Sequence, residues 1–352
     1  MSPSTPQLVY VAFGPEIYKK EAVFSISSAI CMRDRLTPDF SFGVQVFTDH
    51  PAYFDQLPVR VLPIDSKWRG PSNYKFRVKH AAVREVLDHY TQASFIDSDT
   101  FFKKSPADLF ERIKPGQVLC NFFGEQLKHL PAQEILRAAS IRVELNTESK
   151  QTNSGVIGIS REDSGVLDKS LSLMDELYPI FPDFYTLEEL CLAMAASQHN
   201  LAQCSDVIHH YWSRKDIYRA KIQAWLTKHG DSQLNAAAMD DITRINDQLP
   251  KPDQPLRAIQ KLTTLGLPKA HRQFCRELLY GCHSYENEYD RACAEAWYAK
   301  AEKNLAERLP ADRHEIRRII KHPLFALIAG DGYKGVMSFF QQDVVSQLES
   351  KR

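Results

Sequence analysis

Apolar and polar positions alternate along the first 220 residues in a way that predicts strands and helices in turn. Short apolar runs that end at turn residues predict buried strands, and apolar residues three or four apart predict helices with one packed face. The strands are predicted at Leu8–Phe13, Phe42–Thr48, Val59–Leu62, Ala93–Ile96, Gln117–Phe123 and Gly155–Ile159, and the helices at Ala22–Arg35, Tyr74–Tyr90 and Asp168–Tyr178. This alternation indicates an α/β fold with a mainly parallel sheet flanked by helices.

After about residue 220 the strand pattern stops and only helical periodicity remains. Helices are predicted at Glu286–Leu305, at His314–Ile328 with an interruption at Pro323, and at Gly335–Leu348. The segment Leu249–Leu256 is rich in proline and reads as a connector. We therefore expect two domains, an α/β domain at 1–220 and an all-α C-terminal extension at 221–352.

Composition and charge exclude several classes of protein. Lys plus Arg and Asp plus Glu both number 44, and this balance argues against binding to nucleic acid through bulk charge. The N-terminus lacks the basic start and apolar core of a signal peptide, and no apolar stretch approaches the roughly 20 residues of a membrane span. The 7 cysteines form no paired spacing. We expect a cytoplasmic protein without a transmembrane segment, and peripheral contact with the inner face of a membrane stays open.

The sharpest chemical signal is a pair of acids directly after the predicted strand Ala93–Ile96. Asp97 and Asp99 flank Ser98. Residues two apart point to the same side of an extended chain, and open α/β sheets bind ligands at the carboxyl ends of their strands. Two such carboxylates repel each other unless a cation lies between them, and oxygen ligands favour Mg²⁺ or Mn²⁺. The alternative is a strand end followed by an acidic turn.

Three further residues could contact a nucleotide near this strand end. Asp49 ends the predicted strand Phe42–Thr48, where its carboxylate could accept hydrogen bonds from a base or ribose. Lys75 and Lys79 stand four apart on one face of the predicted helix Tyr74–Tyr90, where like charges are mildly unfavourable and a bound diphosphate would remove that penalty. A solvated helix face is the alternative for both lysines, and a turn acid before Pro51 is the alternative for Asp49.

In order and spacing, these segments resemble the GT-A-fold glycosyltransferases, whose sheet is Rossmann-like. The segment Asn153–Gly158 is similar to the NxGV segment of the glycogenin-like group, glycosyltransferase family 8. The segment Val207–Lys215 resembles the closing HxxGxxK segment of that group, with Trp212 in place of its glycine. Glu188 and Glu189 fall where the group carries an Asp-Gln pair.

The resemblance implies a nucleotide-sugar site within about residues 8 to 220. It implies that Asn153 lines the sugar pocket, that Glu188 or Glu189 binds or polarises the sugar or acceptor, and that Lys215 contacts the diphosphate. Further contacts to the nucleotide are implied for Ala12, Phe13 and Ser98. Because most members of the group use UDP-sugars, it also implies that UDP is preferred over other diphosphates.

Two adjacent histidines are candidates for a third metal ligand. An imidazole beside Asp97 and Asp99 suits Mn²⁺ better than Mg²⁺. Adjacent residues of a strand face opposite ways, so we expect only one of His209 and His210 to bind the ion. The six-residue offset to Lys215 in the resembling segment favours His209, and a one-residue gap would make it His210.

The sequence therefore predicts a Mn²⁺- or Mg²⁺-dependent glycosyltransferase. It would move a sugar from a nucleotide-diphospho sugar, such as a UDP-sugar, to a carbohydrate, glycolipid or protein acceptor. A sugar nucleotidyltransferase is an alternative, although the segment GPEIYKKE after the first strand lacks the glycine-rich loop expected there. The other alternative is a catalytically silent protein that binds nucleotide sugars or acts as a scaffold.

Overall fold

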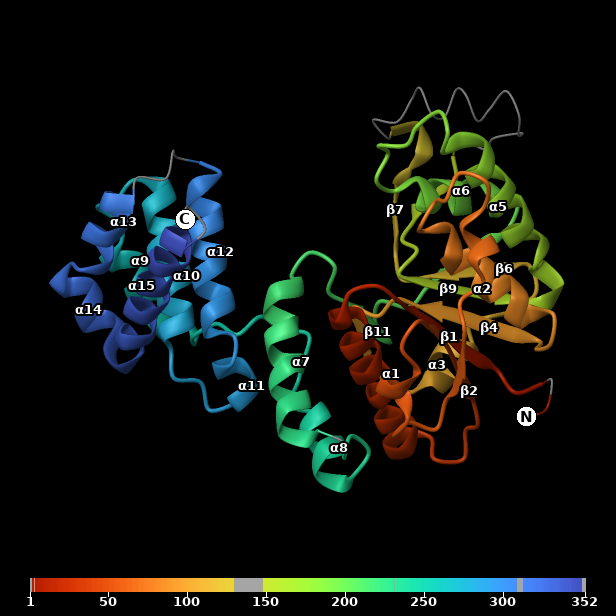
Figure 1. Ribbon diagram of the computed structural model, residues 1–352, viewed down its shortest axis with the longest axis horizontal. Helices are drawn as coiled ribbons and strands as arrows, with labels where there is room; N and C mark the ends of the chain where they lie inside the picture. Colours follow the sequence, from red (N-terminus) through yellow and green to blue (C-terminus); the bar gives the residue numbers. More distant parts are fainter. Residues whose placement is uncertain (1, 3, 130–147, 231, 309–312, 350–352) are drawn as a thin grey trace. The chain divides into compact units, whose positions relative to one another are not determined.

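The computed structural model describes residues 2, 4–129, 148–230, 232–308 and 313–349, and side chains only up to residue 308 and from 316 to 341 (Figure 1). It divides into two compact units, Met1–Trp212 with His229–Ile242, and Ser213–Lys228 with Thr243–Arg352. Most of helix α7 (Lys215–His229) belongs to the second unit. None of the described helices has the length and apolarity needed to cross a bilayer.

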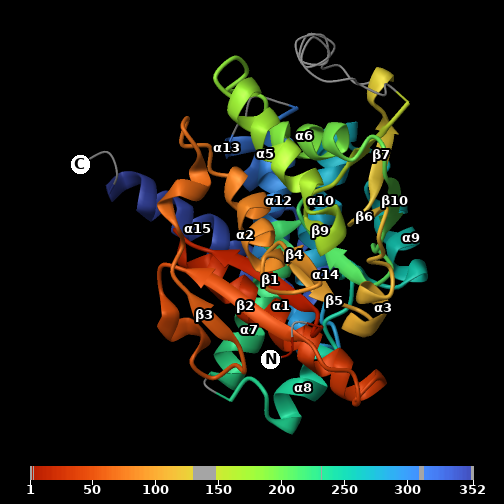
Figure 2. The ribbon, with the colours of Figure 1, turned by 90° about the vertical axis from the view of Figure 1, so that its right-hand side faces the viewer.

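The first unit is built on a seven-stranded sheet in the order β10-β6-β9-β4-β1-β2-β3 (Figure 2). All neighbouring strands are parallel except β9, which runs antiparallel to β4 and β6. The strands are β1 (Gln7–Ala12), β2 (Gly43–Thr48), β3 (Arg60–Leu62), β4 (Gln92–Ile96), β6 (Gln117–Cys120), β9 (Val156–Ser160) and β10 (Asn200–Gln203). The predicted α/β class with a mainly parallel sheet is confirmed.

The buried strands of this sheet carry apolar side chains on both faces. Helices therefore cover both faces of the sheet. Val9 of β1 joins the core beneath α2 (Arg77–Leu87), α5 (Gly165–Leu177) and α6 (Leu187–Ala195). Tyr10 points to the other face, where its hydroxyl lies 3.0 Å from the Ser25 hydroxyl of α1 (Glu16–Leu36). The helices α3 (Pro106–Phe110) and α8 (Ala236–Ile242) complete this unit.

The first unit also contains two small two-stranded sheets. β5 (Thr100–Phe102) pairs with β11 (Ile208–His210), and β7 (Phe123–Gln126) pairs with β8 (Lys150–Thr152), both antiparallel. Buried serines of α1 anchor β5, because the Phe102 N–H donates to the Ser28 hydroxyl at 2.9 Å and the Ser25 hydroxyl lies 2.9 Å from that of Thr100. The strand that follows the two acids is therefore fixed to α1.

The described residues of the second unit form helices and loops and no strand, as the sequence predicts. Its core includes the packed faces of α10 (Lys269–Cys282) and α12 (Ala294–Ala306). Gly281 lets the Tyr298 ring approach α10, because a Cβ at Gly281 would lie 2.5 Å from that ring. Its helices are α7, α9 (Gln254–Thr263), α10 (Lys269–Cys282), α11 (Glu288–Arg291), α12 (Ala294–Ala306), α13 (Arg313–Ile320), α14 (Pro323–Ala329) and α15 (Tyr333–Glu349).

Several predicted boundaries differ from the structure. The helix predicted at Glu286–Leu305 is two helices, because Cys293 leaves the helical region with ψ 2° and is buried against Ile217 and Trp297. Helix α2 begins only at Arg77, so Lys75 lies before it, exposed. The break predicted at Pro323 is confirmed, since proline suits the first position of a helix.

Candidate functional site

The two acids occupy the turn that leads from β4 into β5. The Asp97 N–H donates to the Gly155 carbonyl at 2.8 Å, and the Tyr211 N–H donates to the Asp99 carbonyl at 3.1 Å. The Thr100 hydroxyl also donates to the Asp97 carbonyl at 2.8 Å. These bonds hold the backbone of the turn against the start of β9 and the end of β11, so the carboxylates are presented from a fixed frame.

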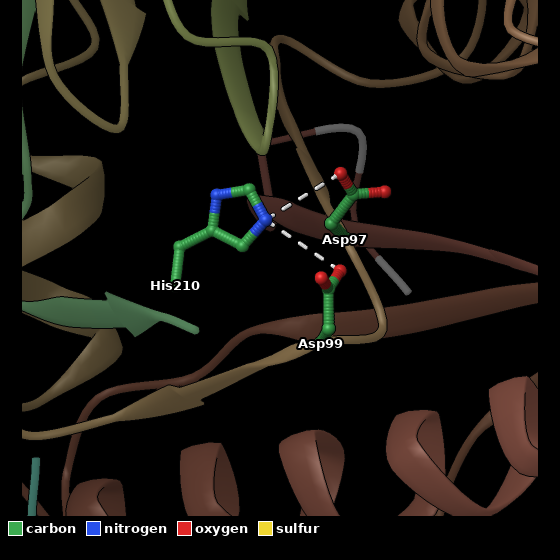
Figure 3. A group of neighbouring side chains, drawn as sticks. All are labelled: Asp97, Asp99 and His210. Carbon is green, nitrogen blue, oxygen red and sulfur yellow. Dashed lines mark ion pairs between the residues drawn. The ribbon is translucent and has the colours of Figure 1, made fainter. Parts of the chain in front are cut away.

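His210 is the histidine that reaches these acids (Figure 3). In the β5–β11 sheet His210 lies opposite Thr100, and its Nε2 is 3.5 Å from Asp99 Oδ1 and 3.9 Å from Asp97 Oδ2. His209 faces the other side of this two-stranded sheet, with its ring centroid 5.1 Å from that of Phe101. The offset to Lys215 had favoured His209, but strand alternation and the register with β5 bring His210 to the carboxylates.

The donors of Asp97, Asp99 and His210 fit a divalent cation. One candidate ligand atom from each residue lies within 4.8 Å of the others. Ligand atoms bound at about 2.1 Å to one octahedral ion lie roughly 3 to 4 Å apart, so the observed spacings need little change. Two carboxylate oxygens with one imidazole suit Mn²⁺. Mg²⁺ is the alternative, and as a harder Lewis acid it prefers oxygen ligands.

A partly buried lysine, Lys79, lies between Asp97 and a second carboxylate, that of Glu188. Lys79 Nζ lies 3.0 Å from Asp97 Oδ2 and 3.8 Å from Glu188 Oε1. Burial alone would lower the pKa of Lys79, but the carboxylates of Asp97 and Glu188 outweigh it and hold that pKa above its usual range. Lys79 is therefore a fixed positive charge within an acid-rich site.

Glu188 is buried and held by groups that the sequence did not single out. Its Oε2 accepts a hydrogen bond from the Tyr74 hydroxyl at 2.9 Å, and its Oε1 accepts one from the Ser154 hydroxyl at 3.3 Å. Both donors come from segments quoted in the sequence analysis, but no local pattern distinguishes a tyrosine or serine that reaches a carboxylate. The contacts span 114 and 34 residues of chain.

Glu189 lies beside Glu188 and turns toward the start of β9. Its Oε1 accepts hydrogen bonds from Asn153 Nδ2 at 2.9 Å and from the Ser154 N–H at 3.2 Å. Burial and the neighbouring Glu188 carboxylate raise the pKa of Glu189 to about 7, although the Ser154 N–H opposes the shift. Glu189 therefore changes its charge near neutral pH.

This pKa predicts how stability depends on pH. The folded-state pKa of Glu189 lies above its unfolded value of about 4.5, so its contribution is full below pH 4.5 and is lost as pH rises through 7. We expect the free energy of unfolding in EDTA to fall as the pH is raised from 4.5 to 7. The fall should be larger in the native protein than in Glu189→Gln, by up to about 3 kcal/mol. Denaturant unfolding at several pH values measures the difference, and parallel profiles would contradict it.

Gly155 makes room for the His210 ring. A Cβ at Gly155 would lie 2.2 Å from His210 Nδ1. We expect Gly155→Ala to displace the imidazole and to weaken Mn²⁺ binding about tenfold or more, as loss of ligand orientation does elsewhere. Gly165→Ala is the matched control, because a Cβ there meets nothing within 4 Å. Mn²⁺ titration followed by electron paramagnetic resonance measures both, and equal affinities would show that the ring has room to move.

Asp49 closes the turn after β1. Its Oδ2 accepts the Gly14 N–H at 2.9 Å, and its Oδ1 lies 3.0 Å from the buried Lys19 Nζ. Partial burial raises the pKa of Asp49, but these two donors outweigh it and hold the pKa below its usual range. The Asp49 side chain remains 43% exposed, so it is still accessible to a ligand.

The other predicted nucleotide contacts lie in different surroundings. Ala12 is buried at the end of β1, and Phe13 follows it with the Arg69 guanidinium 5.3 Å from its ring centroid. Ser98 is partly buried between the acids, while the Lys75 Nζ lies 4.7 Å from the Phe76 ring centroid. Lys215 begins α7 in the second unit.

No family model and no curated protein matches the chain. Similar solved structures include the bifunctional glycosyltransferase WbbM in its apo form, with TM-score 0.40 and 12% identity over 56% of this chain and 39% of that one. The galactosyltransferase LgtC, in complex with donor and acceptor sugar analogs, has TM-score 0.44 and 11% identity over 72% of this chain and 99% of its own. Mouse xyloside xylosyltransferase 1, in its apo form, has TM-score 0.40 and 13% identity over 57% of this chain and 85% of its own. This chain thus spans about two fifths of the length of WbbM.

Proposed function

We propose that this chain is a glycosyltransferase that uses a nucleotide-diphospho sugar, with a divalent cation, Mn²⁺ or Mg²⁺, held by Asp97, Asp99 and His210. The observation that carries the proposal is the meeting of these three ligands with Lys79 and Glu188 at one edge of the sheet. A cation ligand set, a fixed ammonium and a buried carboxylate are the groups that a charged diphosphate leaving group and a polar sugar require.

In this reaction the bond between the anomeric carbon and the diphosphate breaks, and its electron pair leaves with the nucleoside diphosphate. The acceptor hydroxyl oxygen forms the new bond to the anomeric carbon, and its proton passes to the departing nucleoside diphosphate or to water. When bound, the divalent cation would neutralise charge on the leaving diphosphate. Asp97, Asp99 and His210 would orient that cation, and Glu188, which Tyr74 and Ser154 hold in place, would contact the sugar or acceptor.

The proposal extends to the classes of donor and acceptor. UDP-sugars are the proposed donors, with Asp49 at the base or ribose, Ala12, Phe13 and Ser98 along the nucleotide, and Lys75 and Lys215 at the diphosphate. The acceptor would be a carbohydrate, a glycolipid or a protein. We also propose the catalytic domain at 1–220, the helical extension at 221–352 and a cytoplasmic location that allows contact with the inner face of a membrane.

A thermal-shift screen of nucleotide sugars, each with and without Mn²⁺, tests this function. A ligand that binds only the folded protein stabilises it by mass action, so a donor at 100 times its Kd adds about 2.7 kcal/mol. We expect UDP-sugars to give the largest shift, only with Mn²⁺, and to release UDP when an acceptor is added. Release of pyrophosphate from a nucleoside triphosphate would instead show a nucleotidyltransferase, and binding without turnover on any acceptor would show a silent binding protein.

A further inference from the structure

The amide of Asn153 has only one orientation that satisfies its neighbours. The Gly155 N–H points at Asn153 Oδ1 over 3.2 Å, and a backbone N–H can only donate, so the atom that faces it must be the oxygen. The Nδ2 at the other end donates to Glu189 Oε1 at 2.9 Å. That carboxylate oxygen also accepts the Ser154 N–H at 3.2 Å, which keeps it in the acceptor role.

This orientation determines which nitrogen of His210 carries a proton. His210 Nδ1 lies 3.1 Å from Asn153 Oδ1, and an amide oxygen can only accept, so Nδ1 must be the donor. In a neutral imidazole the other nitrogen then holds the lone pair. That nitrogen, Nε2, is the one that faces Asp97 and Asp99 (Figure 3).

We propose that Asn153, anchored by Glu189 and Gly155, is a positioning residue that holds His210 in the tautomer with Nδ1 protonated and Nε2 free for a metal ion. The inference rests on the proposed metal site. It gives Asn153 and Glu189 a role through His210, whereas the sequence resemblance implies contact with the sugar or acceptor. Both polar atoms of the Asn153 amide are already engaged in this chain of hydrogen bonds.

The other neutral tautomer of His210, with the proton on Nε2, shows why a positioning residue is needed. The two carboxylates near Nε2 attract a proton to that nitrogen, where it would donate to Asp99 Oδ1 and exclude a cation. The Asn153 oxygen, as a hydrogen-bond acceptor beside Nδ1, favours the tautomer with the proton on Nδ1. Loss of a hydrogen-bond partner on the far nitrogen of a metal-binding histidine typically costs 10- to 100-fold in metal affinity, which sets the expected effect of removing the Asn153 oxygen.

Nitrogen-15 NMR of the histidine rings tests the proposal in the metal-free protein. The spectrum is recorded in EDTA at about pH 8, where an ordinary imidazole is neutral. The His210 signals, among the 12 histidines, are assigned by their loss in His210→Gln. We expect the native ring to be protonated at Nδ1 and bare at Nε2. A proton on Nε2 in the native protein would overturn the proposal, whatever the variants do.

Two variants then separate a positioning role from a chemical one. Asn153→Leu removes the acceptor, so we expect a proton on Nε2 and Mn²⁺ affinity 10- to 100-fold lower. Glu189→Gln keeps an oxygen that accepts from Asn153 and removes only the charge, so the tautomer and the Mn²⁺ affinity should stay native. An unchanged tautomer and Mn²⁺ affinity in Asn153→Leu, or loss of both in Glu189→Gln, would refute the inference.

The tautomer is read without metal, donor or acceptor, so it is independent of sugar transfer. If no nucleotide sugar binds but His210 shows the expected tautomer, the proposed function fails and the positioning role stands. If UDP-sugars bind with Mn²⁺ while Nε2 carries the proton in the metal-free protein, the function stands and the positioning role fails.

Discussion

Replacing Asp99 with asparagine is expected to lower kcat/KM for sugar transfer by at least about a thousandfold. The substitution keeps the shape of a buried side chain and removes the negative charge that a cation needs. Stabilisation of transition-state charge by a metal is worth several kcal/mol, and each 1.36 kcal/mol is a factor of ten in rate. Release of UDP from the donor found in the thermal-shift screen measures the loss.

Stability measurements separate this effect from misfolding. Asp99→Asn relieves repulsion with Asp97, so its melting temperature in EDTA should equal or exceed that of the native protein. Its gain in melting temperature on adding Mn²⁺ should disappear. Asp39→Asn, at an exposed acid between α1 and β2, is the matched control and should keep both activity and the Mn²⁺ response. Full activity of Asp99→Asn in EDTA would remove the metal from the mechanism.

Replacing Lys79 with glutamine is expected to destabilise the metal-free protein and to strengthen its binding of Mn²⁺. The change leaves Asp97 and Glu188 without the ammonium that lies between them, and breaking a buried pair costs about 3 kcal/mol. Removing a positive charge 3.0 Å from a ligand carboxylate also removes its repulsion of the cation, so Mn²⁺ should bind about tenfold more tightly or better.

Thermal unfolding in EDTA and in Mn²⁺ measures both effects of Lys79→Gln. The variant should melt roughly 5–10 °C below the native protein in EDTA and should recover most of that loss in saturating Mn²⁺. Lys114→Gln, at an exposed lysine between α3 and β6, is the control and should leave both values unchanged. If Mn²⁺ binds equally well to native protein and Lys79→Gln, the ammonium does not act on the cation site.

Local sequence patterns are sufficient to predict most strands and helices of the first unit. The apolar runs at β1, β2 and β4 fall where they were predicted, because a strand buried on both faces needs a continuous apolar sequence. The ends of helices were harder to predict. Helix α2 was predicted to include Lys75, and its late start at Arg77 takes that lysine off the helix face it was expected to share with Lys79.

The direction of β9 could not be read from its own residues. A buried strand has the same apolar composition whether it runs parallel or antiparallel to its neighbours. Because β9 is antiparallel to β4, its first residue, Val156, pairs with Ile96, the last residue of β4. This pairing brings Asn153 and Gly155 to the edge that carries Asp97 and Asp99.

By itself, the sequence determined the α/β class, the helical character of the C-terminal unit, and the two acids after a buried strand, because these depend on residue types within a few positions of one another. Only the tertiary structure decided that His210 rather than His209 meets the acids, since that depends on the register of β11 against β5, more than one hundred residues earlier. Likewise, Lys79 of α2 meets Asp97, and Tyr74, just before α2, meets Glu188 of α6, only because α2 packs against β1 and β4 of the sheet and against α5. Contacts between distant segments are selected by packing and charge in the folded protein, and these leave no local pattern in the chain.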